Sequence, residues 1–485
     1  MVSKFAGLLP SQSLKVEANK IAKSFLNSSS ATVSTDFVSI EETSFLTDKV
    51  SFASSVFVLA FVQETKIENK NTNANSFFID YNIFSIQTGQ EVWPVLPIGA
   101  LCSIKTSRIT LAIATLSAFW ISLIIIVLIL GGKTYFCDVK IHEKYIKRCI
   151  ELAKNGLGTT YPNPLVGSVI VHENKIIGEG WHKKAGEPHA EVNAVNSVKN
   201  KSLLAESTIY VSLEPCSHFG KTPPCCDLII QQKIPNIVIG TIDPFAKVSG
   251  NGIKKLIEAD RNVTVGILEK ECNELNKRFF TFHQKKRPYI ILKWAESANG
   301  FLSPDTKEEQ KPVWITNTYS RQLVHKWRTE EQAILVGTQT VLDDNPRLDS
   351  RDWKGNNPIR IVLDRTGKIS NDYFVKDNTT KTIIITEEEK LTNSENIIFE
   401  NVIFDSSLPD SILEILYKND IQSVIIEGGK KTLQTFIDAG LWDEARIFKG
   451  IHFFQSGTAA PKLKGELIER KNILNDELLI FKSHG

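Results

Sequence analysis

The chain has 485 residues, of which 42% are hydrophobic and 23% are charged, so it is long enough for about three domains with ordinary cores. Its formal net charge of +2 excludes the strongly basic overall field that is typical of nucleic-acid-binding proteins. Seven cysteines in a chain of this length exclude a small secreted disulfide scaffold.

The N-terminal part, residues 1–108, contains polar low-complexity stretches and no catalytic pattern, so its role stays open. The segment 109–130 reads ITLAIATLSAFWISLIIIVLIL and carries no charge. As a helix it would extend about 33 Å, enough to cross the hydrocarbon core of a bilayer, so it predicts a transmembrane helix. The alternatives are a buried core helix and a gene model extended upstream of a true start near Val139.

From Val139 onward, strand and helix patterns alternate as is typical of helices layered on a sheet. The patterns predict helices over 142–155, 189–198, 225–232 and 252–260, and strands over 166–171, 175–180, 207–213 and 236–242. His189 and Cys225 each stand at the beginning of a predicted helix. The positive end of a helix favours a thiolate or a hydroxide at these positions.

One group of residues in this part has the pattern of a catalytic zinc site. His189 is followed by Glu191, and Cys216 and Cys225 lie in one proline-rich loop. One imidazole and two thiolates can hold Zn²⁺ and leave its fourth position for water, whose pKa the metal lowers toward ~7. Glu191 is suited to proton transfer, as in zinc nucleobase deaminases. The pattern predicts a hydrolytic zinc site with Glu191 as its catalytic residue.

Two other uses of these cysteines stay open. A closed structural zinc site would take Cys226 or His218 as its fourth ligand, although adjacent Cys225 and Cys226 rarely face one metal. A disulfide is the second alternative. The remaining cysteines are interpreted as small buried hydrophobic residues: Cys102, Cys137, Cys149 and Cys272.

A polar junction, Lys285–Pro288, separates this part from a second alternating pattern. The pattern predicts strands over 289–293, 333–336, 358–364, 382–386 and 423–426, and helices over 320–329, 411–419 and 432–439. The strand over 423–426 leads through Glu427-Gly428-Gly429 into a helix, whose first amides could hold a phosphate. The glycine pair alone is equally typical of a tight turn. No acid–base pair is evident in this half.

Several sequence motifs of the first half indicate a particular protein family, which the secondary-structure pattern alone does not. They are Tyr161-Pro-Asn-Pro-Leu-Val-Gly167, Gly180-Trp-His182, Gly186-Glu-Pro-His-Ala-Glu191, Glu214-Pro-Cys-Ser-His-Phe-Gly-Lys-Thr-Pro-Pro-Cys225 and Asp243-Pro with Gly250-Asn-Gly252. With them, residues 139–485 resemble the bifunctional riboflavin-biosynthesis enzymes that join a pyrimidine deaminase to a reductase. The Cys-x8-Cys spacing separates that family from the nucleic-acid and nucleoside deaminases with Cys-x-x-Cys.

The resemblance implies an α/β fold in which residues 139–284 form a cytidine-deaminase-like three-layer sandwich with one Zn²⁺. This domain would deaminate a phosphoribosylated diaminopyrimidinone. The implied substrate contacts are Asn163, His182, Lys221 and Asp243, and His218 is a candidate for the same pocket.

The second half carries matching stretches as well: Lys293-Trp-Ala295, Gly300, Trp314-Ile-Thr316, Arg328, Val336-Gly-Thr-Gln-Thr340, Asp343-Asp-Asn-Pro-Arg-Leu348, Arg351 and Glu427-Gly-Gly429. They imply a dihydrofolate-reductase-like α/β domain over 288–485 that uses NADPH to reduce the ribosyl chain to ribityl. The implied cofactor contacts are Ala295, Trp314, Thr340, Asp344 and Gly429. The implied substrate contacts are Arg328, Leu348, Arg351 and Glu427, and the two arginines suit a ribose phosphate.

The chain departs from the family pattern at a few positions. Phe245 replaces an asparagine that often follows Asp-Pro, which puts one substrate hydrogen bond in doubt. Ala298-Asn299-Gly300 stands where Leu-Asp-Gly is usual, and Gln332 stands where many relatives have aspartate. None of these changes removes a metal ligand or Glu191.

Two rival functions are a nucleic-acid or nucleoside deaminase, and a membrane-tethered binding or regulatory protein whose catalytic domains are inactive. The near-neutral charge and the second domain argue against the first, and the intact zinc pattern argues against the second. We therefore expect a small-molecule phosphoribosyl pyrimidine substrate, no nucleic acid, and a homo-oligomer. The catalytic domains are expected in the cytoplasm, with membrane association through 109–130 if that segment is translated.

Overall fold

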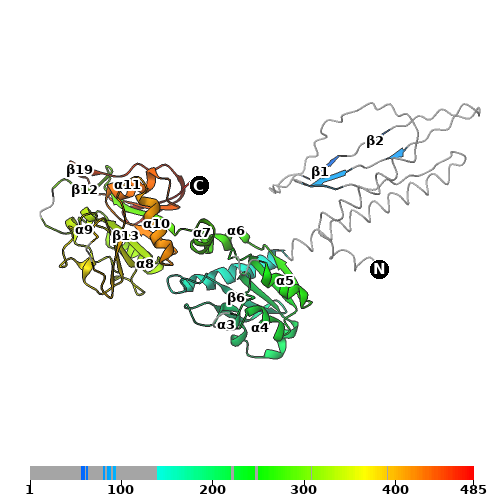
Figure 1. Ribbon diagram of the computed structural model, residues 1–485. Coiled ribbons are helices and arrows are strands. Elements are labelled where there is room, and N and C mark those ends of the chain that lie inside the picture. Colours follow the sequence, from blue (N-terminus) through cyan, green and yellow to red (C-terminus); the bar gives the residue numbers. More distant parts are fainter. Residues whose placement is uncertain are drawn as a thin grey trace, which may run out of the picture. The chain divides into compact units, whose positions relative to one another are not determined.

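The computed structural model describes residues 139–219, 223–245, 250–306, 309–389 and 392–484, together with short strands between residues 56 and 93 (Figure 1). Those strands are β1 (Val56–Leu59), β2 (Val62–Gln63), β3 (Asp80–Tyr81), β4 (Ser85–Thr88) and β5 (Glu91–Trp93). The predicted membrane span over 109–130 lies outside the described residues, as does Lys221. Among the residues that are described, no helix has the length and apolar character needed to cross a bilayer.

The first half begins with a helix over 139–153. It continues with η1 (Lys154–Gly156), β6 (Gly167–His172), β7 (Lys175–Trp181), α3 (Ala190–Ser197), η2 (Lys201–Glu206), β8 (Thr208–Leu213), α4 (Cys225–Gln231), β9 (Asn236–Thr241), α5 (Asn251–Glu258), β10 (Asn262–Val265), α6 (Glu269–Leu275) and α7 (Lys277–Lys285). Its five strands form one sheet in the order β10-β9-β8-β6-β7. β6 is antiparallel to β7 and β8, whereas β8, β9 and β10 are parallel.

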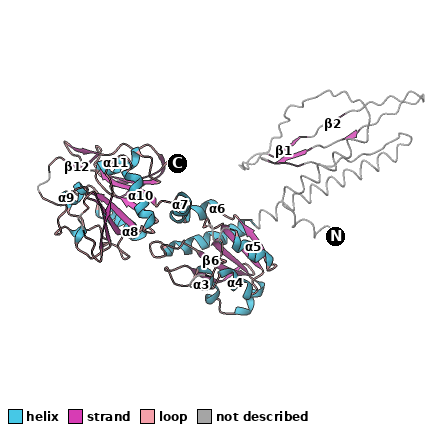
Figure 2. Cartoon of the chain, viewed as in Figure 1, coloured by secondary structure: helices cyan, strands magenta, loops and turns pink. Residues whose placement is uncertain are grey.

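Helices cover both faces of this sheet because successive strand residues point to opposite sides. Ile209 and Val211 of β8 pack into a cluster with side chains of α3, α4 and α5. Tyr210, between them, packs into a second cluster with the helix over 139–153 and with Cys272 of α6. The predicted three-layer arrangement is therefore what the structure has (Figure 2).

The second half contains β11 (Tyr289–Glu296), β12 (Phe301–Pro304), α8 (Thr318–Glu330), β13 (Ala333–Gly337), α9 (Thr338–Asp344), β14 (Ile359–Leu363), η3 (Phe374–Lys376), β15 (Thr382–Thr386), β16 (Ile397–Asn401), α10 (Leu408–Lys418), β17 (Ser423–Ile426), α11 (Lys430–Asp438), β18 (Glu444–Lys449), β19 (Gly457–Ala459), β20 (Glu466–Ile473) and β21 (Asp476–Lys482). Its main sheet has nine strands in the order β16-β15-β14-β13-β17-β11-β18-β21-β20. The pairs from β16 to β18 are parallel, and β21 and β20 add an antiparallel edge.

Helices α10 and α11 cover one face of this sheet and α8 and α9 the other. Because β13, β17 and β11 are parallel neighbours, their carboxyl ends lie at one edge of the sheet. In an open α/β sheet, that edge is where ligands usually bind. The segments that follow β13 and β17 begin with α9 and with Glu427.

Buried charges join the two halves at α7. Arg278 of α7 pairs with buried Glu331, which follows α8, through two hydrogen bonds, one of them 2.7 Å long. Lys277 donates to Glu444 of β18 at 2.7 Å. Arg446 lies 2.6 Å from Glu444 and 3.5 Å from Glu331. Since an unpaired buried charge is costly, removing one member of this network would weaken the joint.

Every helix and strand expected from residue 139 onward is present, with ends that differ by a few residues. Three ends differ by three residues: the first helix is described from 139 rather than 142, β11 ends at Glu296 rather than Lys293, and α10 begins at Leu408 rather than Ser411. At α10, Pro409 fits the first turn. The patterns missed β10, α6, α7, β12, α9, β16, β18, β19 and the final β20–β21 hairpin, as well as the short helices η2 and η3. Seven of the eight residues of β20 are exposed, so this edge strand has no alternating apolar pattern.

Candidate active sites

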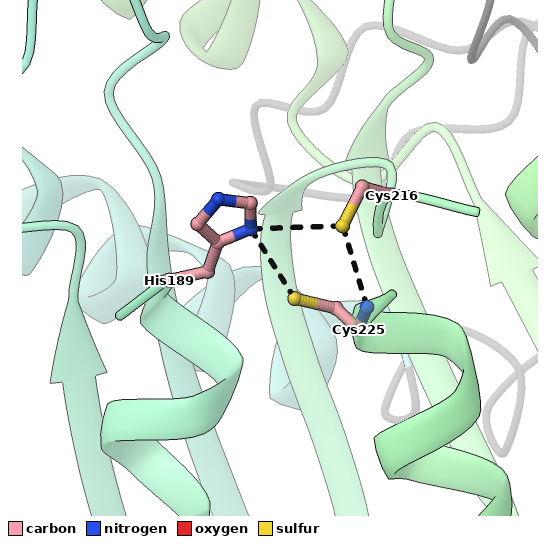
Figure 3. Close-up of side chains that lie close together, drawn as sticks. All are labelled: His189, Cys216 and Cys225. Atoms are coloured by element: carbon pink, nitrogen blue, oxygen red, sulfur yellow. Dashed lines mark hydrogen bonds between the residues drawn. The ribbon is translucent and has the colours of Figure 1, made fainter. Parts of the chain in front are cut away.

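Three side chains from separate segments of the first half lie together (Figure 3). His189 is the N-cap residue of α3, and Cys225 is the first residue of α4. Cys216 lies in the loop that connects β8 to α4. His189 Nδ1 lies 3.6 Å from Cys216 Sγ and 3.4 Å from Cys225 Sγ. The three possible ligand atoms all lie within 4.8 Å of one another.

These distances fit a zinc ion. Tetrahedral Zn²⁺ with Zn–N near 2.05 Å and Zn–S near 2.3 Å places nitrogen and sulfur ligands about 3.6 Å apart. The measured separations of 3.6 and 3.4 Å agree with that edge length. The donor set, one imidazole and two thiols, is also one that zinc favours. With three protein ligands, a fourth coordination position stays open for water.

The surroundings of the thiols favour a negative charge. The backbone N–H of Cys225, at the positive end of α4, donates to Cys216 Sγ at 3.3 Å. Hydrogen bonds from Cys225 and His189 lower the pKa of Cys216 to about 4. The hydrogen bond with Cys216 in turn raises the pKa of Cys225, because it favours the protonated thiol, and burial and the repulsion between two negative sulfurs act in the same direction. A cation between them would remove that repulsion.

Glu191 lies in the first turn of α3 and is buried, with 3% of its surface exposed. Burial raises the pKa of its carboxyl to about 7, and the negative charge at Cys216 acts in the same direction. Glu191 is not one of the three grouped ligand residues, although it lines the same cavity. A carboxyl that can hold or release a proton near neutral pH is suited to proton transfer.

The alternative of a closed site with four protein ligands does not fit the structure. The thiol of Cys226 faces away from the group and donates to the carbonyl oxygens of Pro215 (3.3 Å) and Gly252 (3.6 Å). His218 is exposed and is not part of the ligand group, although it lines the cavity. None of the described cysteines forms a disulfide, and Cys149 and Cys272 are buried as expected.

Asn163 and His182 form one hydrogen-bonded unit beside the ligand group. Pro188 carbonyl oxygen lies 3.2 Å from His182 Nδ1, and Asn163 Nδ2 lies 3.0 Å from His182 Nε2. Burial lowers the pKa of His182, so the neutral ring donates through Nδ1 and accepts from Asn163 through Nε2. The ring of His182 also packs edge-on against His189, with centroids 5.3 Å apart.

Asp243 is buried, and burial raises its pKa to about 6. Its Oδ1 accepts a hydrogen bond from the N–H of Phe245 at 2.8 Å. The carboxylate of Glu214 accepts from the N–H groups of Asp243, Gly250 and Gly252, at 3.3, 3.0 and 2.9 Å. Glu214, which the sequence patterns did not single out, thus links the Cys216 loop to the Asp243 loop.

A cavity of about 710 Å³ contains these groups. It is lined by Asn163, His182, His189, Glu191, Cys216, Asp243, Phe245, by Phe279, Phe282 and His283 of α7, and by Asp420 and Gln422 of the second half. Its size suits a nucleotide-sized molecule. The sequence patterns did not indicate the contribution from α7 and the second half, which only the tertiary structure brings there.

A second group lies at the carboxyl-end edge of the large sheet. Arg328 of α8 donates to both oxygens of Glu427, at 2.8 and 3.4 Å, and to the carbonyl oxygen of Asp349 at 3.0 Å. Lys293 Nζ of β11 lies 3.9 Å from Glu427 Oε2. Burial alone would raise the pKa of Glu427, but Arg328 and Lys293 lower it to about 2.

Lys293 and Glu427 form an ion pair that the sequence patterns did not indicate. Burial lowers the pKa of the Lys293 ammonium, while the negative Glu427 opposes that change. A buried lysine paired with a carboxylate at a ligand-binding edge is a candidate for proton transfer or charge stabilisation. Lys293 stands in the Lys293-Trp-Ala295 stretch, but the pattern gave no reason to separate it from its neighbours.

The predicted cofactor residues lie around the same edge. Thr340 of α9 accepts a hydrogen bond through Oγ1 from the N–H of Gly429, which caps α11, at 3.0 Å. Ala295 is in β11, and Asp344 ends α9. Trp314 is 51% exposed, and the guanidinium of Arg321 lies 4.6 Å from the centre of its ring.

The other two predicted substrate residues, Leu348 and Arg351, lie in different surroundings. Leu348 is 3% exposed and belongs to a hydrophobic cluster with Val341 and Ile369, so its side chain serves the core. Its φ of +54 places the backbone in the left-handed region, which is unusual for leucine. Arg351 is exposed and donates to Asp349 Oδ1 at 2.6 Å. Asp349 thus contacts both Arg328 and Arg351.

Known proteins and families match both halves. Residues 139–241 match the model of the cytidine and deoxycytidylate deaminase zinc-binding region, and residues 288–452 match the model of the RibD C-terminal domain. The riboflavin biosynthesis protein RibD of Aquifex aeolicus is 40% identical over 331 residues, covering 67% of this chain and 89% of that protein. RibD of Escherichia coli is 34% identical over 340 residues, covering 67% and 88%.

Solved structures also match both halves of the chain. The diaminohydroxyphosphoribosylaminopyrimidine deaminase/5-amino-6-(5-phosphoribosylamino)uracil reductase of Thermotoga maritima superposes with a TM-score of 0.66 at 37% identity, covering 71% of this chain and 99% of that one. RibD of Acinetobacter baumannii superposes with a TM-score of 0.65 at 30% identity, covering 72% and 100%. Matches of this extent include both halves and their connection.

Proposed function

The chain belongs to the RibD family of bifunctional riboflavin-biosynthesis enzymes, and we propose that residues 139–284 are its zinc-dependent deaminase domain and residues 288–485 its NADPH-dependent reductase domain. The rival functions, a nucleic-acid deaminase and an inactive regulatory protein, are not favoured. The observation that carries the proposal is the group of His189, Cys216 and Cys225 with buried Glu191 beside it.

In the first reaction, water replaces the amino group at one ring carbon of 2,5-diamino-6-(5-phosphoribosylamino)pyrimidin-4-one, and ammonia leaves. His189, Cys216 and Cys225 would hold one Zn²⁺, which when bound supplies an activated water and a Lewis acid. Glu191 would take one proton from the attacking water and give it to the ring nitrogen, and would then move the proton of the added hydroxyl to the amino group, which leaves as ammonia. Its pKa of about 7 allows the carboxyl to act in both directions.

Other residues of the cavity would bind and orient the substrate. Asn163, fixed by neutral His182, presents its amide to the pyrimidine ring, and Asp243 can accept or donate a hydrogen bond near its pKa of about 6. Lys221, in the loop between Cys216 and Cys225, is a further predicted substrate contact. Phe245 removes one polar contact and leaves an apolar surface in its place.

In the second reaction, the carbonyl carbon of the opened ribosyl chain is reduced to the alcohol of the ribityl chain; NADPH, when bound, would supply the hydride, and a proton would go to the oxygen. Arg328, Glu427 and Arg351 would bind the substrate. Leu348, which packs in the core, would support the substrate site from below. Ala295, Trp314, Thr340, Asp344 and Gly429 would bind NADPH on a dihydrofolate-reductase-like fold. The first amides of α11, held by the Gly429–Thr340 hydrogen bond, suit a phosphate of the cofactor.

We further propose that the catalytic domains act in the cytoplasm, where NADPH is available, as a homo-oligomer that binds no nucleic acid. Membrane attachment applies only if 109–130 is translated and spans a bilayer. Intact mass of the native protein in soluble and membrane fractions tests this directly. A full-length species confined to the membrane fraction would establish the attachment, whereas a soluble species that begins near residue 139 would remove it.

The proposed deaminase is tested by Glu191→Gln in the full-length chain. We expect the rate of ammonia release to fall by about 10³-fold, because general acid–base catalysis of this kind contributes 10²–10⁴-fold. Zinc content and reduction of the deaminated substrate should be unchanged, since Glu191 is neither a ligand nor part of the second half. Glu206→Gln, an exposed residue at the end of η2, is the control. Full activity in the Glu191 variant would contradict the assignment.

A further inference from the structure

The loop over 156–163 in the deaminase half lies directly against the reductase half. Gly158 has a φ of +85, and a Cβ there would lie 2.0 Å from the carbonyl oxygen of Thr329 near the end of α8. The hydroxyl of Tyr161 donates to the carbonyl oxygen of Glu330 at 3.2 Å and lies 3.1 Å from Ser423 Oγ. The loop is therefore seated on the end of α8 and the start of β17.

Gln422 makes a contact with this loop at the lining of the deaminase cavity. Its side chain is buried, and its Nε2 donates to the carbonyl oxygen of Pro162 at 2.6 Å. Pro162 precedes Asn163, whose amide contacts His182 inside the cavity. Gln422 and neighbouring Asp420 line that cavity themselves. A buried hydrogen bond at this point fixes the backbone from which the Asn163 side chain extends.

Gln332 in turn fixes Gln422. Its Oε1 accepts from the N–H of Gln422 at 2.8 Å, and its Nε2 donates to the carbonyl oxygen of Asp420 at 3.0 Å. Only an amide can donate and accept in this way, whereas a carboxylate can only accept. Replacing Gln332 by an acidic residue would therefore remove the hydrogen bond to Asp420.

We propose that the reductase half completes the deaminase site, with Gln332 and Gln422 as positioning residues that hold Pro162 and Asn163 in place for the pyrimidine substrate. The inference rests on the proposed deaminase function. It makes the two halves more than a fusion of independent enzymes, because the substrate-binding geometry of the first depends on the sheet of the second.

The test uses Gln422→Ala and Gln332→Ala in the full-length, zinc-loaded chain, with deamination and reduction assayed on separate substrates. We expect the KM for deamination to rise about tenfold in each variant, the effect of losing one positioning hydrogen bond, with a much smaller change in kcat. Zinc content and the kinetics of the reductase should stay unchanged. The double variant should be no worse than the Gln422 variant, because both residues act through one contact.

Asn396→Ala is the matched control, since its amide donates to the backbone carbonyl of Asn378 at 2.9 Å and the residue does not line the deaminase cavity. An unchanged KM for deamination in both glutamine variants overturns the inference. The milder variant Gln332→Glu keeps the hydrogen-bond acceptor and removes the donor. If this variant and the alanine variants all lose deamination and reduction to the same extent, the inference is also overturned. Absence of deamination in the unaltered chain would instead refute the proposed function itself.

Discussion

At Glu427, a carboxylate that burial would keep neutral is charged because Arg328 and Lys293 contact it. Glu427 directly follows β17, Arg328 lies in α8 and Lys293 lies in β11, so none of them owes its charge state to its neighbours in sequence. A pKa that is lowered on folding stabilises the native state whenever the pH is above the ordinary pKa of the group. Glu427 is therefore a local source of stability as well as a predicted substrate contact.

This gives a pH-dependent prediction for Glu427→Gln. The folded pKa of about 2 lies below the usual 4.5, so the charge of Glu427 stabilises the fold above about pH 4.5. That stabilisation is lost as the pH falls toward 2, and its full size is about 3 kcal/mol. Urea unfolding of the full-length chain and the variant should give a difference in unfolding free energy that is constant near neutral pH and shrinks in acid.

Glu469→Gln on exposed β20 is the control, with almost no difference at any pH. A difference for Glu427→Gln that stays the same down to about pH 3 would mean that Glu427 is not held charged by its neighbours.

At the scale of elements, both sites lie where strands end and helices begin. His189 and Cys225 start α3 and α4, and Thr340 and Gly429 lie at α9 and the start of α11. These elements could be predicted because buried strands and amphipathic helices leave a periodic pattern. The loop over 156–163 leaves no such pattern, and its place against α8 depends on close packing of backbone.

Gly158→Ala tests that packing. An alanine here must adopt a positive φ and place its Cβ against the Thr329 carbonyl, so we expect the free energy of unfolding to fall by several kcal/mol. Gly266→Ala is a matched comparison, because Gly266 also has a positive φ, +93, but nothing lies within 4 Å of its added Cβ. It should cost only about 1–2 kcal/mol. Equal losses in urea unfolding of the two variants would mean that the contact with α8 is unimportant.

At the scale of the whole molecule, the matches to known families begin at residue 139 and the described core lies within residues 139–484. We predict that a chain beginning with Met followed by residues 139–485 folds and carries out both reactions, with rates within about twofold of the full-length chain, since each domain has its own hydrophobic core. Separate assays of ammonia release and NADPH oxidation measure this. Loss of either activity, with the fold retained by circular dichroism, would assign a catalytic role to residues 1–138.

The sequence by itself singled out the predicted zinc ligands His189, Cys216 and Cys225 and the predicted proton-transfer residue Glu191, and it predicted most of the strands and helices from residue 139 onward. These features depend on residue type and on local periodicity, both of which can be read along the chain. Only the tertiary structure decided that Lys293 lies beside Glu427, that Leu348 packs into the core, and that Gln422 reaches Pro162. The same holds for the burial of Arg278 and Glu331 between the two halves. Such contacts join residues far apart in the sequence through packing and desolvation, and no local pattern records them.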